Sequence, residues 1–217
     1  MCSTERNRFS DWEKTYETLE FEEMPWWYEK LDPDIDAALK HCGFKHGGFK
    51  HCGISAENSG PRVLDLGCGP GTQAFELAQR GFDVLASDLS PKAIEKVKKR
   101  FKLDQLRLRF IQDDILESKL EGPFDLVIDR GCFHVIKPEA RASYIATLSS
   151  LLEKNKYYFL KCFSEKETME DGPHRFSEAE IRELFSSSFE ILSIDETVYY
   201  GTLEQYPIAL FSVMKKL

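Results

Sequence analysis

The sequence has no hydrophobic run long enough to cross a membrane. Its longest apolar stretches, such as residues 124–128 and 157–163, are far shorter than the roughly 20 residues that a spanning helix requires. Residues 1–11 are polar and contain no apolar segment followed by a small-residue cleavage site, so a secretory signal is not expected. These absences predict a cytoplasmic protein without a membrane partner.

Positive charge is also in short supply. The chain carries 29 Lys and Arg residues against 37 Asp and Glu residues, a formal net charge of -8. It therefore has no general basic field to attract a phosphate backbone. We expect a small molecule, and not a nucleic acid, as the principal partner.

The pattern from residue 61 onward is typical of repeated βαβ units. Short β-branched or apolar runs alternate with amphipathic stretches of about ten residues, which favours a parallel sheet. Strands are predicted at 62–66, 83–87, 106–112, 124–129, 157–163, 189–199 and 208–215. Residues 200–207 are too few for a parallel crossover, so the last strand is predicted to run antiparallel.

Helix start signals stand between these strands. Ser90 with Pro91 suits the first turn of one helix, Pro138 opens another, and Ser177 with Glu180 has the spacing of a capping box. Strands and helices together predict an α/β fold, a Rossmann-like seven-stranded mixed sheet with helices on both faces. The length suits one such domain, at residues 61–217, and we expect a monomer or a weak dimer.

Residues 1–60 are predicted to form a helical extension. Ser10 and Glu13 have capping-box spacing ahead of a helix that carries Trp12 and Tyr16, and Asp32 precedes a proline that starts a second helix. The extension thus brings aromatic side chains to the domain that follows it.

A five-residue unit occurs three times between the extension and the sheet, at residues 40–44, 45–49 and 50–54. Every copy contains a histidine and two copies contain a cysteine, and these are ligands that zinc prefers. The spacing matches no familiar zinc knuckle, however, and the glycines favour a locally duplicated linker. We therefore expect no metal site.

Residues 63–71 form the segment that carries most of the chemistry, Val-Leu-Asp-Leu-Gly-Cys-Gly-Pro-Gly. An apolar strand runs into a glycine turn and then into a helix, and glycines allow a ligand to approach the backbone closely. The GxGxG spacing differs from the GxGxxG of dinucleotide folds. Asp65, just before the turn, would repel a pyrophosphate and attract a cationic amino group.

This segment resembles the first motif of the class I S-adenosylmethionine (SAM)-dependent methyltransferases, and the resemblance continues to the end of the chain. It implies the Rossmann-like sheet described above, SAM as the cofactor and S-adenosylhomocysteine as its product. The first-motif residues implied to bind the cofactor are Asp65, Gly67, Cys68, Gly69 and Gly71.

Two further strand ends carry cofactor positions by the same resemblance. Asp88, with Leu89 after it, resembles the acidic residue that accepts hydrogen bonds from both ribose hydroxyls, and a cap on the following helix is the structural alternative. Asp114 and Ile115, in Gln-Asp-Asp-Ile, resemble the adenine site, although a solvated acidic loop would have the same composition.

The fourth predicted strand ends in Asp129-Arg130-Gly131, and His134 follows. By resemblance, Asp129 lies beside the methionine part of SAM and is a catalytic candidate. The triplet is also similar to one in thiopurine and related thiol or halide methyltransferases. His134 is the second catalytic candidate because an imidazole can take a proton from an incoming nucleophile, with ribose contact or packing as the alternative.

The acceptor side is expected to draw on the extension and on the loop after the fifth predicted strand. Tyr16, Trp26 and Trp27 are candidates for an apolar lid that excludes water, with ordinary helix packing as the alternative. Arg130 and Arg175 are the charged candidates, and Arg175 has the chemistry to anchor an anionic acceptor.

The sequence thus predicts an enzyme that moves the methyl group of SAM to a small-molecule thiol, halide, amine or hydroxyl by in-line displacement. A macromolecular methyltransferase for tRNA or protein is the first alternative, but the chain lacks an Asn-Pro-Pro-Tyr-type motif and an added RNA-binding domain. A non-catalytic SAM-binding regulatory module is the second.

Overall fold

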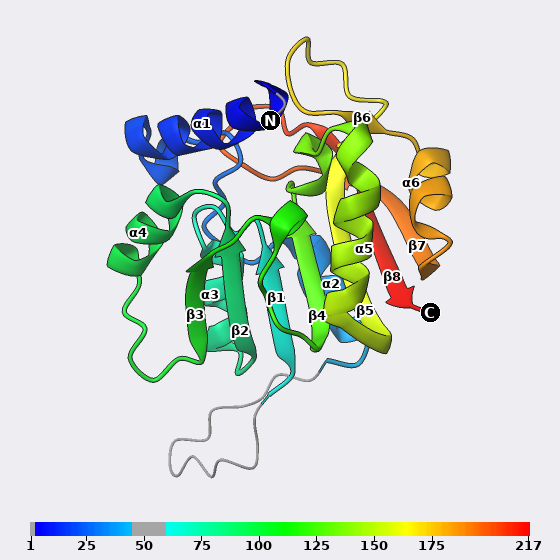
Figure 1. Ribbon diagram of the computed structural model, residues 1–217, viewed down its shortest axis with the longest axis horizontal. Coiled ribbons are helices and arrows are strands. Elements are labelled where there is room, and N and C mark those ends of the chain that lie inside the picture. Colours follow the sequence, from blue (N-terminus) through cyan, green and yellow to red (C-terminus); the bar gives the residue numbers. More distant parts are fainter. Residues whose placement is uncertain (1–2, 45–59) are drawn as a thin grey trace.

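Within residues 3–44 and 60–217, which the computed structural model describes, eight strands form one mixed sheet that helices cover on both faces (Figure 1). The strands are β1 Arg62–Leu66, β2 Asp83–Asp88, β3 Leu108–Gln112, β4 Phe124–Arg130, β5 Leu152–Ser164, β6 Arg175–Phe176, β7 Phe189–Val198 and β8 Ile208–Lys216. The helices are α1 Ser3–Thr18, α2 Pro33–His41, α3 Thr72–Gln79, α4 Pro91–Arg100, α5 Arg141–Leu151 and α6 Glu178–Phe185.

The strand order confirms the predicted topology. Along the sheet the order is β3-β2-β1-β4-β5-β8-β7, and β8 runs antiparallel to both of its neighbours, β5 and β7, while the other pairs are parallel. The two-residue β6, which pairs with β5 off this path, was not predicted. β5 also begins earlier than predicted, because Leu152 pairs with Phe124 ahead of a register shift in the ladder.

The two faces of the sheet carry different helices. Successive strand residues point to opposite faces. Val63 and Ile128 therefore pack in the core that includes α2, α3 and α4, while Leu64 and Val127 pack with α5 and α6. By the same alternation, the side chains of Asp129 and Arg130 at the end of β4 lie on opposite faces of the sheet.

Three predicted helix starts are confirmed. Ser90 Oγ accepts a hydrogen bond from the N–H of Ala93 at 3.0 Å at the start of α4, and Asp32 caps α2. Ser177 and Glu180 form the reciprocal capping box of α6. Short-range signals were sufficient at these positions because donor and acceptor lie within one helical turn.

The predicted start of the first helix is wrong. α1 spans Ser3–Thr18, so Ser10 lies inside the helix and not at its start. Glu13 Oε2 instead accepts a hydrogen bond from Ser90 Oγ and another, at 3.3 Å, from Lys92 N. The carboxylate of Glu13 therefore lies at the N-terminus of α4, where the helix dipole favours a negative charge. α1 itself lies across the carboxyl ends of the strands, above α4 (Figure 1).

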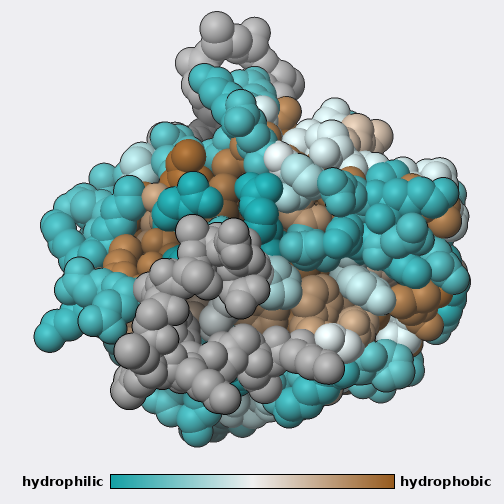
Figure 2. Space-filling view, turned by 90° about the horizontal axis from the view of Figure 1, so that it is seen from below, coloured by the Kyte–Doolittle hydropathy of each residue, from teal (hydrophilic) through white to brown (hydrophobic). Residues whose placement is uncertain are grey.

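The opposite end of the sheet is visible in Figure 2, where hydrophilic side chains surround smaller hydrophobic areas. In the described part of the chain, no helix combines the length and the apolar character of a membrane span. Residues 45–59, which include the second and third copies of the five-residue unit, lie outside the described residues.

Candidate functional site

The glycine turn after β1 forms the floor of the site. Gly67, Gly69 and Gly71 have φ angles of 68°, 47° and 72°. A Cβ added at Gly69 would lie only 2.9 Å from the hydroxyl oxygen of Tyr16 in α1. Glycine is therefore required here both for the backbone conformation and for the close approach of the extension.

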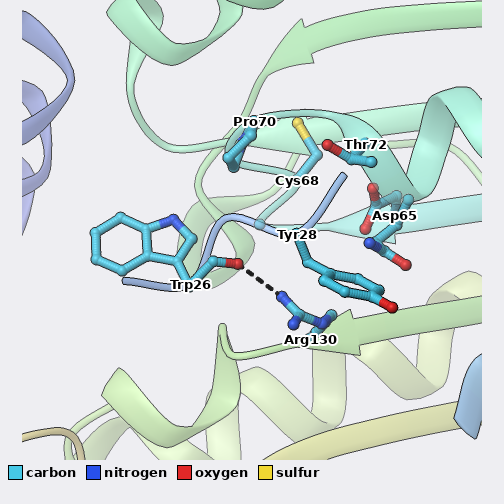
Figure 3. A pocket seen from close by; sticks show the side chains of 9 residues that line it. Trp26, Tyr28, Asp65, Cys68, Pro70, Thr72 and Arg130 are labelled. Atoms are coloured by element: carbon cyan, nitrogen blue, oxygen red, sulfur yellow. Dashed lines mark hydrogen bonds between the residues drawn. The ribbon is translucent and has the colours of Figure 1, made fainter. Parts of the chain in front are cut away.

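A pocket opens beside this turn (Figure 3). Trp26 and Tyr28 of the extension form one wall, Asp65 of β1 another, and Arg130 reaches in from the end of β4. The other lining residues are Gly67, Cys68, Pro70, Thr72 and Gln73. The pocket thus brings together three of the five first-motif residues, Asp65, Gly67 and Cys68, with Trp26 and Arg130 from the acceptor-side candidates.

Asp65 is a carboxylate short of partners. Its side chain is buried, and Oδ2 accepts one hydrogen bond from Ala74 N at 3.1 Å. Burial raises the pKa of Asp65 to about 7, and the negative charges of Asp129 and Asp88 contribute to the rise. A cationic group in the pocket would stabilise the ionised form.

Asp88 ties the end of β2 to the glycine turn. Oδ2 accepts a hydrogen bond from Gly69 N and Oδ1 from Ser90 N, both at 2.9 Å. Burial raises the pKa of Asp88 to about 6 in spite of these bonds. The side-chain cap of α4 is Ser90 itself, so Asp88 supports the turn and the helix start together, and Leu89 lies half-buried between them.

The two neighbouring acids after β3 play different parts. Asp114 Oδ1 accepts from Leu116 N at 3.0 Å and caps the short turn that begins with the buried Ile115. Asp113 Oδ1 accepts from Lys119 N at 2.9 Å, but its Oδ2 is buried with no hydrogen-bond partner among the described residues. The sequence did not separate these two acids, and an unpaired buried oxygen is costly without a ligand or water.

Asp129 lies on the face of the sheet that α5 covers. Its Oδ1 accepts from Cys132 N at 2.7 Å, and its Oδ2 accepts from Phe133 N at 2.9 Å and from the hydroxyl of Tyr144. Burial raises the pKa of Asp129 to about 6. It does not line the pocket, and these bonds fix the backbone turn that follows β4.

Arg130 joins the two sides of the pocket. Its guanidinium donates to Trp26 O at 3.0 Å (Figure 3) and to Tyr200 O in the β7–β8 loop. A third bond, 2.8 Å long, runs to Asp32 Oδ2. Because every one of these bonds goes to the protein, the guanidinium braces the pocket and is not free to hold an anion.

Behind Arg130 lies a charge network that sequence reasoning missed. Lys161 and Asp32 are fully buried, and Lys161 Nζ is 2.8 Å from both oxygens of Asp32 and 2.6 Å from Asp34 Oδ2. Burial opposes ionisation of Asp32, but the charges of Lys161 and Arg130 outweigh it and lower the pKa. A lysine inside the apolar run 157–163 was the one sequence signal for this network.

His134 is buried between two aromatic rings. The ring centroids of Phe163 and Tyr199 lie 5.2 and 5.8 Å from that of His134, and His134 Nδ1 accepts a hydrogen bond from Phe163 N at 3.3 Å. Burial, with the charge of Arg130 nearby, lowers the pKa of His134 to about 3. A neutral imidazole that accepts at Nδ1 carries its proton on Nε2, so in this arrangement the ring is a donor there.

The remaining acceptor-side candidates divide between the pocket and other places. Tyr16 is buried over Gly69, and Trp26 lines the pocket. Trp27 packs against the core on the α2 and α3 face and does not line the pocket. Arg175 lies in β6, donates to Met169 O, and is likewise outside this pocket.

Comparison with known proteins identifies the family of the chain. The model of a methyltransferase domain matches residues 63–155. An uncharacterized methyltransferase of Schizosaccharomyces pombe is 38% identical over 104 residues, which are 48% of this chain and 72% of the relative. The 2-heptyl-1-hydroxyquinolin-4(1H)-one methyltransferase of Mycobacteroides abscessus is 30% identical over 143 residues, 64% of this chain and 63% of the relative.

Solved structures share the fold over nearly the whole chain. Burkholderia thailandensis 1,6-didemethyltoxoflavin-N1-methyltransferase, solved with 1,6-didemethyltoxoflavin and S-adenosylhomocysteine, superposes with a TM-score of 0.69 at 21% identity, covering 100% of this chain and 91% of that one. The superposition shows the fold, and the S. pombe relative confirms the family resemblance inferred from the glycine turn. The chain belongs to the class I SAM-dependent methyltransferases, enzymes that use S-adenosylmethionine as their cofactor.

Proposed function

We propose that this methyltransferase acts on a small molecule that reaches the pocket between Trp26, Tyr28 and Arg130. One observation carries the proposal: the extension folds down onto the glycine turn, so that Tyr16 touches the turn and leaves a confined pocket. The net charge of -8 adds no attraction for a nucleic acid. The relative from Mycobacteroides abscessus is named for a small-molecule substrate.

The residues around the turn fit the cofactor. SAM supplies a methyl group on a positively charged sulfur, which a nucleophile displaces directly. We assign the ammonium of its amino-acid part to Asp65, because this buried carboxylate has a pKa of about 7 and, among the described residues, accepts one backbone hydrogen bond and forms no ion pair. We assign the ribose hydroxyls to Asp88 with Leu89 beside it, and the backbone approach to Gly67, Cys68, Gly69 and Gly71.

The adenine end of the site is assigned to the segment after β3. Ile115 is buried beside the turn that Asp114 caps, and the unpaired Oδ2 of Asp113 is a second acceptor within the same segment. An exocyclic amine bound there would satisfy an oxygen that otherwise lacks a donor. We propose that Asp114 contacts the adenine, and that Asp113 is a second acceptor for its exocyclic amine.

The chain's own residues orient and enclose the acceptor. Arg130 holds Trp26 and the β7–β8 loop together, Tyr16 and Trp26 exclude water, and Asp129 fixes the turn that carries His134. With SAM bound, a lone pair of the acceptor would bond to the methyl carbon, and the carbon–sulfur electrons would stay on sulfur. Where the nucleophilic atom carries a proton, that proton stays on the methylated product and passes to water when the product leaves the pocket, because His134 is already protonated on Nε2. Alignment in a dry pocket supplies most of the acceleration.

Calorimetric titration with SAM and with S-adenosylhomocysteine tests the cofactor assignment. We expect Asp88→Asn to weaken both by about tenfold or more, since it removes hydrogen bonds to a charged acceptor. Asp83→Asn, at the other end of β2, is the matched control and leaves both affinities unchanged. Equal affinities for wild type and Asp88→Asn would refute the ribose assignment.

A transfer assay with methyl-labelled SAM then tests the acceptor class. We expect label in small products from a panel of thiols, halides, amines and phenols, and none in added tRNA or protein. Label in macromolecules would support a tRNA or protein substrate. Tight binding of SAM without transfer to any acceptor would instead support a regulatory module.

A further inference from the structure

Three tyrosines form a continuous row that leads away from the pocket. Tyr28 is part of the pocket wall (Figure 3), and its ring centroid lies 5.4 Å from that of Tyr200. The ring of Tyr200 lies a further 5.3 Å from that of Tyr206. Both separations are those of rings in contact, so the row is one aromatic surface.

The far end of the row opens into a second hollow. It lies between the segment that follows β5 and the β7–β8 loop, and its apolar walls are Met169, Leu203, Tyr206 and Pro207. Met169 and Tyr206 are 38% and 39% exposed, high values for such large side chains. A thioether is a favourable surface for an aromatic group.

The walls of this hollow are fixed before anything binds. Glu167 Oε1 accepts from the N–H groups of Thr168 and Met169, both at 2.7 Å, and Oε2 accepts from Ile208 N at 2.5 Å. One carboxylate therefore holds the segment after β5 against the start of β8. Both oxygens of Glu167 thus accept hydrogen bonds from the backbone and are not available to a ligand.

The middle of the row is held from behind by the buried cations. Lys161 Nζ lies 4.9 Å from the ring centroid of Tyr200, and Arg130 binds the carbonyl oxygen of the same residue. A ring fixed in this way loses little conformational freedom when another ring stacks on it. The row thus combines aromatic surface, rigidity and a direct connection to the methyl-transfer pocket.

We propose that the tyrosine row Tyr28–Tyr200–Tyr206 and the hollow at its end bind the body of the acceptor, and that the acceptor is a planar aromatic compound. Its rings lie along the row while its nucleophilic atom reaches the pocket beside Trp26. The inference rests on the proposed function, the methylation of a small molecule, and specifies the chemical class of that molecule.

Binding of a matched pair of compounds tests this proposal. Naphthol and its saturated counterpart decahydronaphthol share a carbon skeleton and a hydroxyl group but differ in planarity and in aromatic electrons. Each is titrated into wild-type protein by calorimetry, with and without saturating S-adenosylhomocysteine. We expect naphthol to bind at least about fivefold more tightly than decahydronaphthol, the scale of an added aromatic contact.

Variants at the exposed end of the row locate the site. We expect Tyr206→Ala to weaken naphthol about fivefold and Tyr206→Phe, which keeps the ring, to stay within about twofold of wild type. Leu192→Ala, at an exposed apolar residue of β7, is the control and leaves naphthol binding unchanged. Because Tyr206 is exposed, none of these changes endangers folding.

Equal binding of the two compounds, or an unchanged naphthol affinity in Tyr206→Ala, overturns the aromatic-acceptor proposal. The affinity for S-adenosylhomocysteine, measured in the same titrations, reports separately on the proposed function. If the wild-type protein did not bind S-adenosylhomocysteine, the proposed function would be contradicted. The comparison of Tyr206→Ala with Tyr206→Phe would still decide whether the row binds aromatic rings.

Discussion

Three buried acids of the site, Asp65, Asp88 and Asp129, differ in the number of hydrogen bonds that they accept. Asp129 receives two backbone N–H groups and a tyrosine hydroxyl, and Asp88 receives two backbone N–H groups. Asp65 receives a single one. Burial raises the pKa of all three carboxyls, to about 7 for Asp65 and to about 6 for the other two. The residue with fewest donors is thus the one best suited to a cation.

The affinity for SAM should therefore depend on pH. Below pH 7 the carboxyl of Asp65 is protonated in the free protein and must lose its proton before it can pair with an ammonium group. Between pH 8 and pH 6 its ionised fraction falls about tenfold, and we expect the affinity to fall by the same factor. Calorimetry at both pH values, in buffers of different ionisation enthalpy, measures the affinity and the protons released.

Two variants check the assignment of this pH dependence. Asp65→Asn should bind SAM more weakly and lose most of the change between pH 8 and pH 6. Asp125→Asn, on β4 and away from the pocket, should behave as wild type does. A steep pH dependence that survives in Asp65→Asn would place the titrating group elsewhere.

His134 should remain neutral through the physiological range. Its pKa is lowered to about 3, and its Nδ1 accepts the N–H of Phe163, which selects the tautomer with the proton on Nε2. We expect nuclear magnetic resonance of the imidazole nitrogens to show one unchanging signal pair between pH 5 and 8, assigned by its absence from His134→Asn. Titration of that signal in this interval would restore His134 as a candidate general base.

At the scale of elements, local patterns predicted what local interactions determine. The alternation of strands and helices, the caps at Ser90 and Ser177 and the antiparallel last strand are decided within a few residues. Which acid faces the pocket is decided by register instead. In the β1–β4 ladder Asp65 pairs with Ile128, and Leu66 pairs with Asp129. Paired residues share a face of the sheet, so Asp129 lies on the face opposite to Asp65 and points away from the pocket.

The charge network had no such local signature. Asp32 lies 98 residues before Arg130 and 129 before Lys161, and no periodicity links residues so far apart. Their pairing is a product of the fold, since α2 is brought against the carboxyl ends of β4 and β5. Only the presence of a lysine within an apolar strand hinted that a partner had to exist.

Removal of Lys161 should destabilise the protein strongly. Lys161→Met leaves Asp32 buried with one cation instead of two, and it leaves Asp34 with the hydroxyl of Thr197 but without its ion-pair partner. We expect the free energy of unfolding to fall by about 3 kcal/mol, which is typical of breaking a buried pair. Urea denaturation measures the change as a lower midpoint.

An exposed lysine a few residues away provides the control. Lys166 pairs with Glu196 at 2.6 Å, but its side chain is 65% exposed. Lys166→Met should therefore change the free energy of unfolding by no more than about 0.5 kcal/mol. If the two variants lost similar amounts of unfolding free energy, the buried network would contribute no more to stability than an exposed ion pair.

At the scale of the whole molecule, the extension lines the pocket in which we propose that methyl transfer occurs. α1 crosses the carboxyl ends of the strands and α2 packs on the sheet, so residues from the first fifth of the chain complete a pocket whose floor is the β1 turn (Figure 1). The capping rule failed at Ser10 for this reason. The carboxylate of Glu13 is satisfied by the start of α4, a partner that no local pattern reveals.

This arrangement should control how fast the cofactor exchanges. Tyr16 lies against Gly69 and Glu13 binds Ser90, so α1 must move before a ligand can leave the turn. Glu13→Ala removes the bonds that hold α1 to α4, and we expect S-adenosylhomocysteine to dissociate and associate about fivefold faster, the effect of losing about one hydrogen bond. Stopped-flow fluorescence of Trp12 and Trp26 follows both rates.

The affinity itself should change much less than the rates, because Glu13 acts on the barrier to exchange and not on the contacts made in the bound state. Lys14→Ala alters the neighbouring, exposed position of α1 and should leave both rates as they are. If Glu13→Ala instead raised only the dissociation rate, Glu13 would be stabilising the bound state. If it changed neither rate, the cofactor would have to exchange by a path that does not require α1 to move.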